Sequence, residues 1–502
     1  MTNLDSKRIL FAAVGSIVLA IPLAANAATV NWIGGATGAT TDFSNDANWV
    51  GGQRPTAYSP TVNVVTDTAN FDGTQAGGIV NKTPTLTADY KLYNATFQDS
   101  GWTLDTTSAY TLSVSHKAHA AGGHSLASNA TSGTNTINGK LAFGDYNTNS
   151  YADVYVAAGG TLRLNAAVSV IADSNNGGTT PGNTSGMVTY DGPGTVELNT
   201  TGLNGGGVSV TNGTVKVLAE TVGSFTGDGT GGLGTSANGS LTVSGGTFDF
   251  NRGRSSLTII RLTLGSAGTI TNSASTAETI QITQNGLNTS LDGLISGKLN
   301  LTYLADSGSR TTRITHANTY DGTTTTSTRG ILLVNNTTGS GTGSGNISVG
   351  ANTTLGGTGT ISGNVTANGL IAPGDGGTSI GTLTVGASTF GSTGSLNIDL
   401  GAGASDKLVV NGNLSLNALT ALNLFGTADG VTSYVIARYT GTLTGTFASP
   451  TLPAGYSINY GSGSNSQITL AVPEPATLGL IGVGMLGLLA RRRRGSGVGA
   501  HT

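Results

Sequence analysis

The chain has 502 residues, of which 37% are hydrophobic and only 9% are charged, so it can bury a core and is not a disordered polyampholyte. Its formal net charge of −3 offers no basic surface for nucleic acid, and the lack of cysteine excludes disulfides, thiolate ligands and thiol catalysis. The 80 glycines, together with abundant Thr, Ser and Asn, favour short strands separated by turns, which predicts an all-β protein.

Residues 1–27 have the three parts of a secretory signal peptide. Lys7 and Arg8 form a positive start, an apolar run follows from Ile9 to Leu23, and the small residues Ala25 and Ala27 mark a cleavage site. An amphipathic first helix is the alternative, but it would need a polar face, which this run lacks. We therefore expect signal peptidase to remove residues 1–27 during export.

A short phrase recurs through the body of the chain, which we predict to extend over residues 76–430. Each copy has a glycine, a small polar residue, and then apolar, polar and apolar residues. Because glycine tolerates positive φ and strand side chains alternate between faces, each phrase predicts a turn entering a strand with two apolar residues inward. The copies begin at Gly160, Gly194, Gly213, Gly239, Gly246, Gly381, Gly394 and Gly412. The middle residues Arg163, Glu197, Lys216 and Asp249 are expected to face solvent.

The irregular spacing of these copies favours degenerate stacked coils, and hence a right-handed parallel β-helix (solenoid) with a cap at each end. Residues 28–75, which include Trp32 and Trp49, are predicted to form the N-terminal cap. Residues 431–471 alternate strongly from Tyr434 to Leu470 and are predicted to form a C-terminal β cap of hairpins.

Two pairs of aspartates are candidates for the acid and base of an enzyme that cleaves polysaccharide. Stacked coils could bring Asp173 to Asp191, or Asp399 to Asp406, within the separation of about 5 to 9.5 Å that glycosidic cleavage needs. Asp173, Asp191 and Asp406 lie directly beside Ser or Gly, and Asp399 lies two residues from Asn397; turn residues have such neighbours, and we favour that role. No catalytic residue is predicted.

Two segments have some character of a metal site. His116, His119 and His124 are close in sequence, although the first two would point to opposite faces of a strand. Residues 145–150 begin like a calcium loop, but Ser150 replaces the glycine and Val156 replaces the bidentate glutamate. We predict no metal and no cofactor, with weak calcium binding left open.

The tail combines an extended motif, a short apolar segment and a basic run. Pro473, Glu474 and Pro475 precede an apolar stretch from 476 to 490, which Arg491, Arg492, Arg493 and Arg494 follow. As a helix the stretch would rise about 22 Å, less than the hydrocarbon core of about 30 Å, which predicts a short and marginal transmembrane helix. The arginines would stay on the cytoplasmic side, with 495–502 as a cytoplasmic tail.

This tail resembles the PEP-CTERM sorting signal of Gram-negative bacteria. The resemblance implies recognition by exosortase, a membrane-embedded cysteine transpeptidase, within a sorting region at 472–494. Pro473, Glu474 and Pro475 would then be the sorting motif, and Arg491 to Arg494 the membrane stop. An ordinary anchor that is never cut is the alternative.

A second resemblance lies between Ala317 and Val385. The elements Asn318 to Gly322, Leu332 to Asn336, Leu355 to Gly359 and Ile371 to Gly374 are similar to the autotransporter-associated β-strand repeat of passenger-like surface proteins. The resemblance implies a β-solenoid body and says nothing of chemistry.

Taken together, these patterns predict a non-enzymatic structural protein of the cell surface or extracellular matrix. It would be held transiently in the inner membrane, processed, and displayed or released among exopolysaccharide in a biofilm, a link that rests on the family resemblance. A β-helical enzyme that cleaves polysaccharide, or an adhesin that binds it, is the alternative function.

Overall fold

We analysed a computed structural model, which describes residues 28–34, 41–55, 67–74, 81–114, 124–143, 152–170, 188–199, 203–204, 207–218, 232–233, 240–253, 257–284, 287–304, 310–375, 379–417, 419–448 and 450–472. Over these residues the protein is all-β, as predicted, without an α-helix. Two 3-10 turns, η1 (Asp46–Asn48) and η2 (Val50–Gly52), lie near the N-terminus.

The strands of the described residues belong to three sheets. The first sheet contains β1 (Thr29–Asn31), β2 (Thr68–Phe71), β3 (Tyr90–Leu92), β4 (Asn94–Phe97), β5 (Thr103–Asp105), β6 (Leu112–Val114), β7 (Leu126–Ser128), β8 (Thr134–Phe143), β9 (Ala152–Val156), β10 (Thr161–Val170), β11 (Val188–Tyr190), β12 (Thr195–Leu198), β13 (Leu203–Asn204), β14 (Val208–Val210), β15 (Thr214–Val217), β17 (Ser240–Asp249), β19 (Arg261–Asn272), β21 (Thr289–Leu291), β22 (Leu294–Gly297), β24 (Thr311–Ile314), β26 (Ile331–Val334), β28 (Thr354–Gly357), β30 (Leu370–Pro373), β33 (Ser395–Gly401), β34 (Ala404–Ser405) and β37 (Ala421–Gly426).

The second sheet contains β16 (Gly232–Leu233), β18 (Leu257–Ile259), β20 (Glu278–Ile282), β23 (Leu299–Leu304), β25 (Thr324–Ser327), β27 (Ile347–Val349), β29 (Val365–Ala367), β32 (Ser388–Phe390), β36 (Leu414–Ser415) and β39 (Leu443–Thr444). The third sheet, near the C-terminus, contains β31 (Thr382–Val385), β35 (Lys407–Val410), β38 (Tyr434–Tyr439), β40 (Ser457–Asn459) and β41 (Ser466–Ala471).

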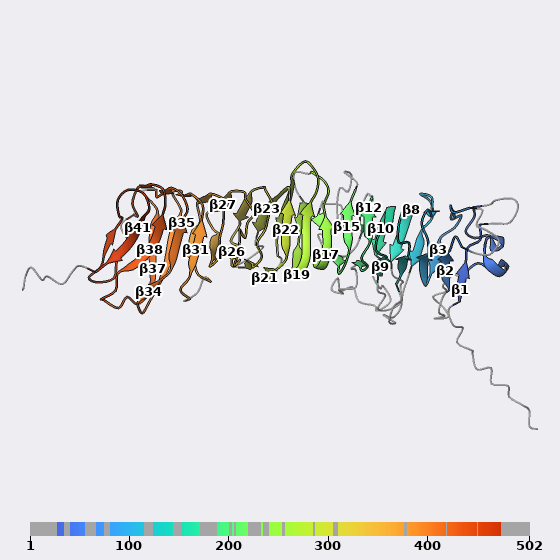
Figure 1. The fold of residues 1–502 in the computed structure, drawn as a ribbon, viewed down its shortest axis with the longest axis horizontal. Helices are drawn as coiled ribbons and strands as arrows, with labels where there is room; N and C mark the ends of the chain where they lie inside the picture. The colour runs from blue at the N-terminus through green and yellow to red at the C-terminus, as the bar shows by residue number, and fades with distance from the viewer. Residues whose placement is uncertain are drawn as a thin grey trace, which may run out of the picture.

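Strand pairing is almost entirely parallel and joins segments that follow one another along the chain. Thr324 of β25 pairs with Ile347 of β27, and Leu332 of β26 pairs with Leu355 of β28. The antiparallel strand pairs among the described residues are β33 with β34, β38 with β41, and β40 with β41. The strands stack along the long axis of an elongated molecule, with β1 to β3 at one end and β37, β38 and β41 at the other (Figure 1).

The core confirms the predicted alternation of the repeated phrase. In every copy both apolar residues are buried, whereas the residue between them lies in the outward row of its strand. These buried pairs are Leu162 and Leu164, Val196 and Leu198, Val215 and Val217, Leu241 and Val243, Phe248 and Phe250, Leu383 and Val385, Leu396 and Ile398, and Leu414 and Leu416.

The reason for glycine in the phrase differs in part from the expectation. Gly213 and Gly246 do have positive φ, of 64° and 68°. Gly160 does not have a positive φ, but a Cβ atom placed on it would lie 2.0 Å from the carbonyl oxygen of Ala130. Close stacking of backbone on backbone therefore requires glycine at Gly160, and backbone dihedral angle alone does not explain the phrase.

Asp249, one of the four residues predicted to face solvent, is buried. Arg163 pairs in register with Glu197, Glu197 with Lys216, and Lys216 with Asp249, which gives a row of alternating charge. Asp249 is only 6% exposed, because Ser273 covers it and donates to its carboxylate through both the backbone N–H and Oγ. The prediction of a solvent-facing Asp249 was wrong, since the covering residue directly follows the neighbouring strand β19.

Aromatic side chains fill the N-terminal end of the core. Trp32 and Trp49 are fully buried with their rings edge to face at 5.2 Å, and Phe43 packs edge to face on Trp49 at 4.9 Å. Phe71 lies below them and stacks on Phe97 of the next strand. Such aromatic pairs contribute about 0.5–1.5 kcal/mol beyond the area they bury, which stabilises the end of the stack.

Candidate functional site

The third sheet positions the end of the described chain. β41 lies between β38 and β40 and is antiparallel to both, and its residues Ile468 and Leu470 are fully buried. β38 is also parallel to β35. Strand β38 therefore joins the antiparallel hairpin of β40 and β41 to the parallel strands of the same sheet. The last described strand is therefore a central strand of its sheet.

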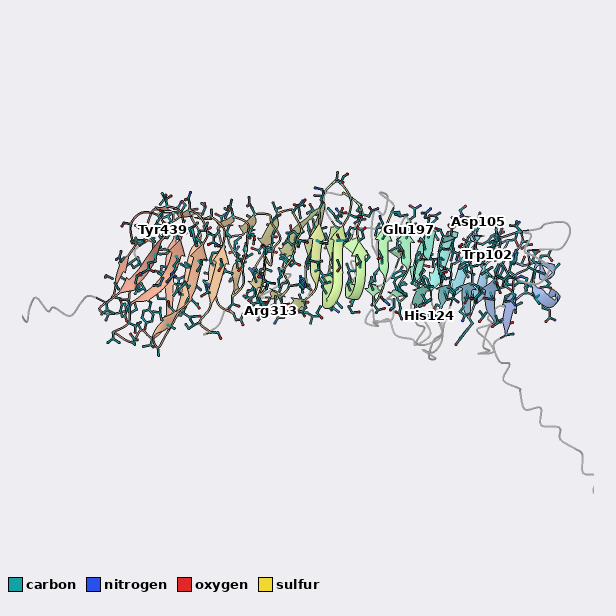
Figure 2. The ribbon with its side chains drawn as sticks, viewed as in Figure 1. Trp102, Asp105, His124, Glu197, Arg313 and Tyr439 are labelled. Atoms are coloured by element: carbon teal, nitrogen blue, oxygen red, sulfur yellow. The ribbon has the colours of Figure 1, made fainter. Side chains whose placement is uncertain are left out.

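Tyrosine side chains fix the loops around this hairpin. The Tyr439 hydroxyl donates to the carbonyl oxygen of Tyr460 at 2.8 Å, and the Tyr460 hydroxyl accepts from the N–H of Phe447 at 3.0 Å. The Tyr434 hydroxyl donates to the carbonyl oxygen of Gly401, which ties β38 to β33. Tyr439 lies at the end of the molecule opposite Trp102 (Figure 2).

The described part of the chain ends at Val472, one residue after β41. The N–H of Val472 lies 3.4 Å from Ser433 Oγ in the loop before β38. The predicted sorting motif, Pro473, Glu474 and Pro475, and the predicted stop, Arg491 to Arg494, lie outside the described residues, as do Ala25 and Ala27 of the predicted cleavage site. Across the part of the chain that is described, no helix has the length and apolar character needed to span a membrane.

The structure brings Asp399 and Asp406 together, but through a hairpin and not by stacking of coils. The N–H of Asp406 donates to the carbonyl oxygen of Asp399 at 2.9 Å. The carboxylate of Asp406 accepts from the N–H of Gly381 at 2.7 Å and from the N–H of Asp399 at 3.1 Å. Burial, with a smaller contribution from the charge of Asp399, raises the pKa of Asp406 to about 6.

This carboxylate is placed to hold backbone and not to meet a substrate. Asp406 is 2% exposed, and each of its oxygens accepts a backbone N–H. Burial also raises the pKa of Asp399, which is more exposed. Asp191 lies at the turn after β11, and its predicted partner Asp173 is outside the described residues.

His124 contacts an aspartate and not a set of metal ligands. Its Nδ1 lies 3.0 Å from Asp153 Oδ2, while Ser125 donates to the other carboxylate oxygen through N–H and Oγ. Burial raises the pKa of Asp153, but the hydrogen bonds from His124 and Ser125 outweigh it and hold that pKa below its usual value. The serine hydroxyl faces the carboxylate and not the imidazole, so this trio does not activate a nucleophile.

The other metal candidates cannot be placed. His116, His119 and the segment 145–150 lie outside the described residues, and Val156 is buried in β9. The described part of the chain contains no group of three or more His, Asp or Glu residues that could hold a metal ion.

The second sheet carries a regular polar surface, which we call the hydroxyl row. One outward position holds Thr, Ser or Gln in each of nine successive strands, and none of these side chains is charged. Strand register joins Thr258, Gln281, Thr302, Thr325, Ser348, Thr366, Thr389, Ser415 and Thr444. With about 4.8 Å between strands, the row is about 38 Å long. The alternation of apolar and polar residues predicted outward polar side chains in single strands, but their alignment into a row depends on which strands pair.

Comparison with known families identifies the segment that follows β41. Residues 471–494 match the PEP-CTERM protein-sorting motif, so the match begins at the last residue of β41 and includes the proline and arginine residues named above. The motif supports an exported protein that carries a C-terminal sorting signal and is sorted by exosortase. A search of curated proteins found no match.

Proposed function

We propose that this chain is a structural rod of the cell surface or extracellular matrix, which exosortase processes and which then associates with exopolysaccharide. The observation that carries the proposal is the place of the sorting motif. It begins at the end of a buried, central strand, so the segment that would be processed is attached directly to a long stack of strands.

We propose that the body, residues 76–430, is a right-handed parallel β-helix with caps at 28–75 and 431–471. Parallel pairing between consecutive coils supports a solenoid, and the strong preference for right-handed crossovers supports its hand. The residues that resemble the autotransporter-associated repeat have structural roles, which fits a repeat without chemistry. Asn318, for example, is buried and bridges the N–H of Ile295 to the carbonyl oxygen of Gly341.

The hydroxyl row supports association with a neutral, extended partner such as exopolysaccharide. Its Thr, Ser and Gln side chains both donate and accept hydrogen bonds and carry no charge to repel or select a charged polymer. Low charge over the whole chain also limits repulsion between rods, which suits a matrix component. The link to biofilm rests on the sorting motif.

Mass spectrometry of the mature C-terminus in cells tests the sorting step. We expect surface-displayed protein to end near Pro473–Pro475 and to begin at Ala28 after signal peptidase has acted. Substitution of Glu474 by Ala should leave the tail attached. If the displayed wild-type protein retains residues beyond Arg494, the tail is an ordinary anchor and the sorting proposal is wrong.

The alternative function, cleavage of polysaccharide, is favoured by one observation: Asp406 has a raised pKa and lies next to Asp399, as an acid in a pair of carboxylates would. We propose that the chain is not an enzyme, because Asp406 is buried and bonded to backbone. A panel of polysaccharides incubated with the exported chain tests this. Turnover that is lost in the Asp406→Asn or Asp399→Asn variant would overturn the structural role.

A further inference from the structure

Exposed apolar side chains are concentrated at the C-terminal end of the molecule. Six large apolar side chains of the described residues are exposed, and three of them lie within 419–431: Leu419 at 65%, Phe425 at 49% and Val431 at 80%. We call these three residues the apolar end. Single exposed apolar residues are ordinary on protein surfaces, but this local concentration is not explained by the core.

The apolar end and the exit of the chain lie at the same end of the molecule, and Val431 is two residues from a contact with Val472. Phe425 lies on β37, whose strand partner among the described residues is β33. Val431 belongs to the loop between β37 and β38, and Ser433 of that loop contacts Val472, the last described residue. β37, β38 and β41 lie together at one end of the stack (Figure 1).

A hydrogen-bonded turn presents Val431 outward. The carboxylate of Asp429 accepts from the N–H of Val431 at 3.0 Å, and from the N–H of Thr432 at 2.7 Å. The hydroxyls of Thr432 and Tyr456 donate to the same carboxylate. The hydrogen bonds from Thr432 and from the N–H of Val431 hold the pKa of Asp429 far below its usual value. Asp429 therefore stays charged beside Val431, which suits the polar headgroup layer of a membrane and not its hydrocarbon core.

The short segment between Val472 and the apolar stretch of the tail indicates that the apolar end faces the membrane. Three residues, Pro473 to Pro475, separate Val472 from the apolar stretch that starts at residue 476. Even fully extended, the four steps from Val472 to residue 476 reach about 14 Å. The headgroup region of one leaflet is about 5–8 Å thick, so an inserted tail holds the end of the rod at the lipid surface.

We propose that the apolar end contacts the headgroup region of the same membrane that holds the tail, so that the rod is seated on the bilayer and not merely tethered to it. This inference rests on the proposed insertion of the tail. Leu419, Phe425 and Val431 would enter the interface, while the neutral hydroxyl row stays in water. The rod would be oriented before the tail is processed.

The lack of cysteine allows a direct test. We would introduce Leu419→Cys, Phe425→Cys or Val431→Cys into the chain Ala28–Thr502, which contains every described strand, and label each with an environment-sensitive fluorophore. Val50→Cys and Leu287→Cys are matched controls, because both residues are exposed and apolar, at 45% and 51%, and lie far from 419–431 in the sequence. The labelled chains would be reconstituted into phosphatidylcholine–phosphatidylglycerol vesicles containing a headgroup-level spin-labelled quencher.

We expect the lipid quencher to lower fluorescence roughly two-fold at the three sites of the apolar end and to leave both controls unchanged. Vesicle flotation reports separately on the tail. Flotation without selective quenching would overturn the seating and leave tail insertion intact, whereas failure to float would overturn both. A spectral shift that depends on protein concentration and not on the quencher would show that a second copy covers this surface, which also overturns the proposal.

Discussion

Several buried polar side chains are paired inside the stack. Four consecutive threonines occupy positions 323–326. Two of them, Thr324 and Thr326, point inward and are at most 1% exposed. The Thr324 hydroxyl lies 2.6 Å from the hydroxyl of Tyr320, and the Thr326 hydroxyl lies 2.5 Å from that of Thr353. Since an unpaired buried hydroxyl costs about 1–3 kcal/mol, these threonines are tolerated because each has a partner.

A double-mutant cycle on Tyr320 and Thr324 tests this pairing. We expect Tyr320→Phe and Thr324→Val each to lower the free energy of unfolding by about 1–3 kcal/mol, because each leaves one hydroxyl unpaired. The double variant should lose less than the sum, by roughly 1 kcal/mol. Urea unfolding followed by circular dichroism provides the measurement. Strict additivity would show that the two hydroxyls do not depend on one another.

Asp406 should make stability depend on pH in the direction opposite to most carboxylates. Its pKa in the folded chain, about 6, lies above the ordinary value of 3.8, so the folded state binds the proton more tightly. The free energy of unfolding should therefore rise as the pH falls from about 7 to about 4, by roughly 3 kcal/mol at most.

Comparison with the Asp406→Asn variant isolates this contribution. The stability of the wild type relative to the variant should increase as the pH falls through about 6, and it should level off below the pKa of the unfolded chain. Thermal unfolding at a series of pH values measures the difference. A difference that does not change between pH 4 and pH 7 would contradict the raised pKa.

At the scale of strands, close contact between neighbouring coils constrains the turns. Gly213 enters β15 with a φ of 64°, and a Cβ atom there would lie 2.1 Å from the carbonyl oxygen of Gly192 and 2.4 Å from that of Gly194. Gly403, in the turn between β33 and β34, has a φ of 75° but no atom within 4 Å of such a Cβ. A side chain at Gly213 would therefore meet both backbone strain and steric overlap, whereas a side chain at Gly403 would meet backbone strain alone.

We expect Gly213→Ala to destabilise the protein by more than about 2 kcal/mol, because strain and overlap add. Gly403→Ala should cost only about 1 kcal/mol, the strain of positive φ in a residue with a side chain. Thermal unfolding of both variants gives the comparison. Equal losses would mean that the stacked carbonyls yield easily and that packing between coils is looser than the distances indicate.

Side-chain amides also join one strand to the next. Asn70 donates to Asn31 at 2.6 Å, Gln98 donates to Asn70 at 2.8 Å, and Asn129 donates to Gln98 at 2.9 Å. A second row runs from Asn199 through Asn165 to Asn138. The inner amides Asn70, Gln98 and Asn165 both donate and accept along the stack, so these rows strengthen one particular register of the strands.

The sequence patterns predicted the strands well, but they did not predict the contacts between one coil and the next. The burial of Leu162 with Leu164 follows from alternation within one strand, which is a local property. Asp249 was not placed correctly, and the burial of Thr324 and the hairpin contact between Asp399 and Asp406 were not predicted, because these surroundings come from residues distant in the strand pattern. The sorting motif was found because its residues are contiguous, but the central position of β41 depends on pairing with β38 and β40.

At the scale of the whole molecule, regular register predicts that coils can be removed. The steps from Thr324 to Ile347 and from Leu332 to Leu355 are both 23 residues long, in two different sheets. Deletion of residues 324–346 should therefore keep both sheets in register and leave a folded, shorter chain, at the cost of the partners of Tyr320 and Thr353. Deletion of residues 324–330 removes β25 from the second sheet but keeps β26 in the first, so the two sheets no longer match and the chain should not fold.

Circular dichroism and resistance to proteolysis measure the outcome of both deletions. A stack in which each coil contacts mainly its neighbours should lose one coil without collapse of the rest. If the deletion of 324–346 unfolds the chain as completely as the deletion of 324–330, the coils depend on longer-range contacts than the pairing indicates.

The position of β41 also determines how the molecule bears load. A pull on the tail acts along β41, which is hydrogen-bonded on both sides to antiparallel neighbours and is buried through Ile468 and Leu470. Force in this direction shears many backbone hydrogen bonds at once and does not open them one by one from an edge. The end of the rod is thus a mechanical clamp, which would resist extraction of the chain until a covalent bond in the tail is cut.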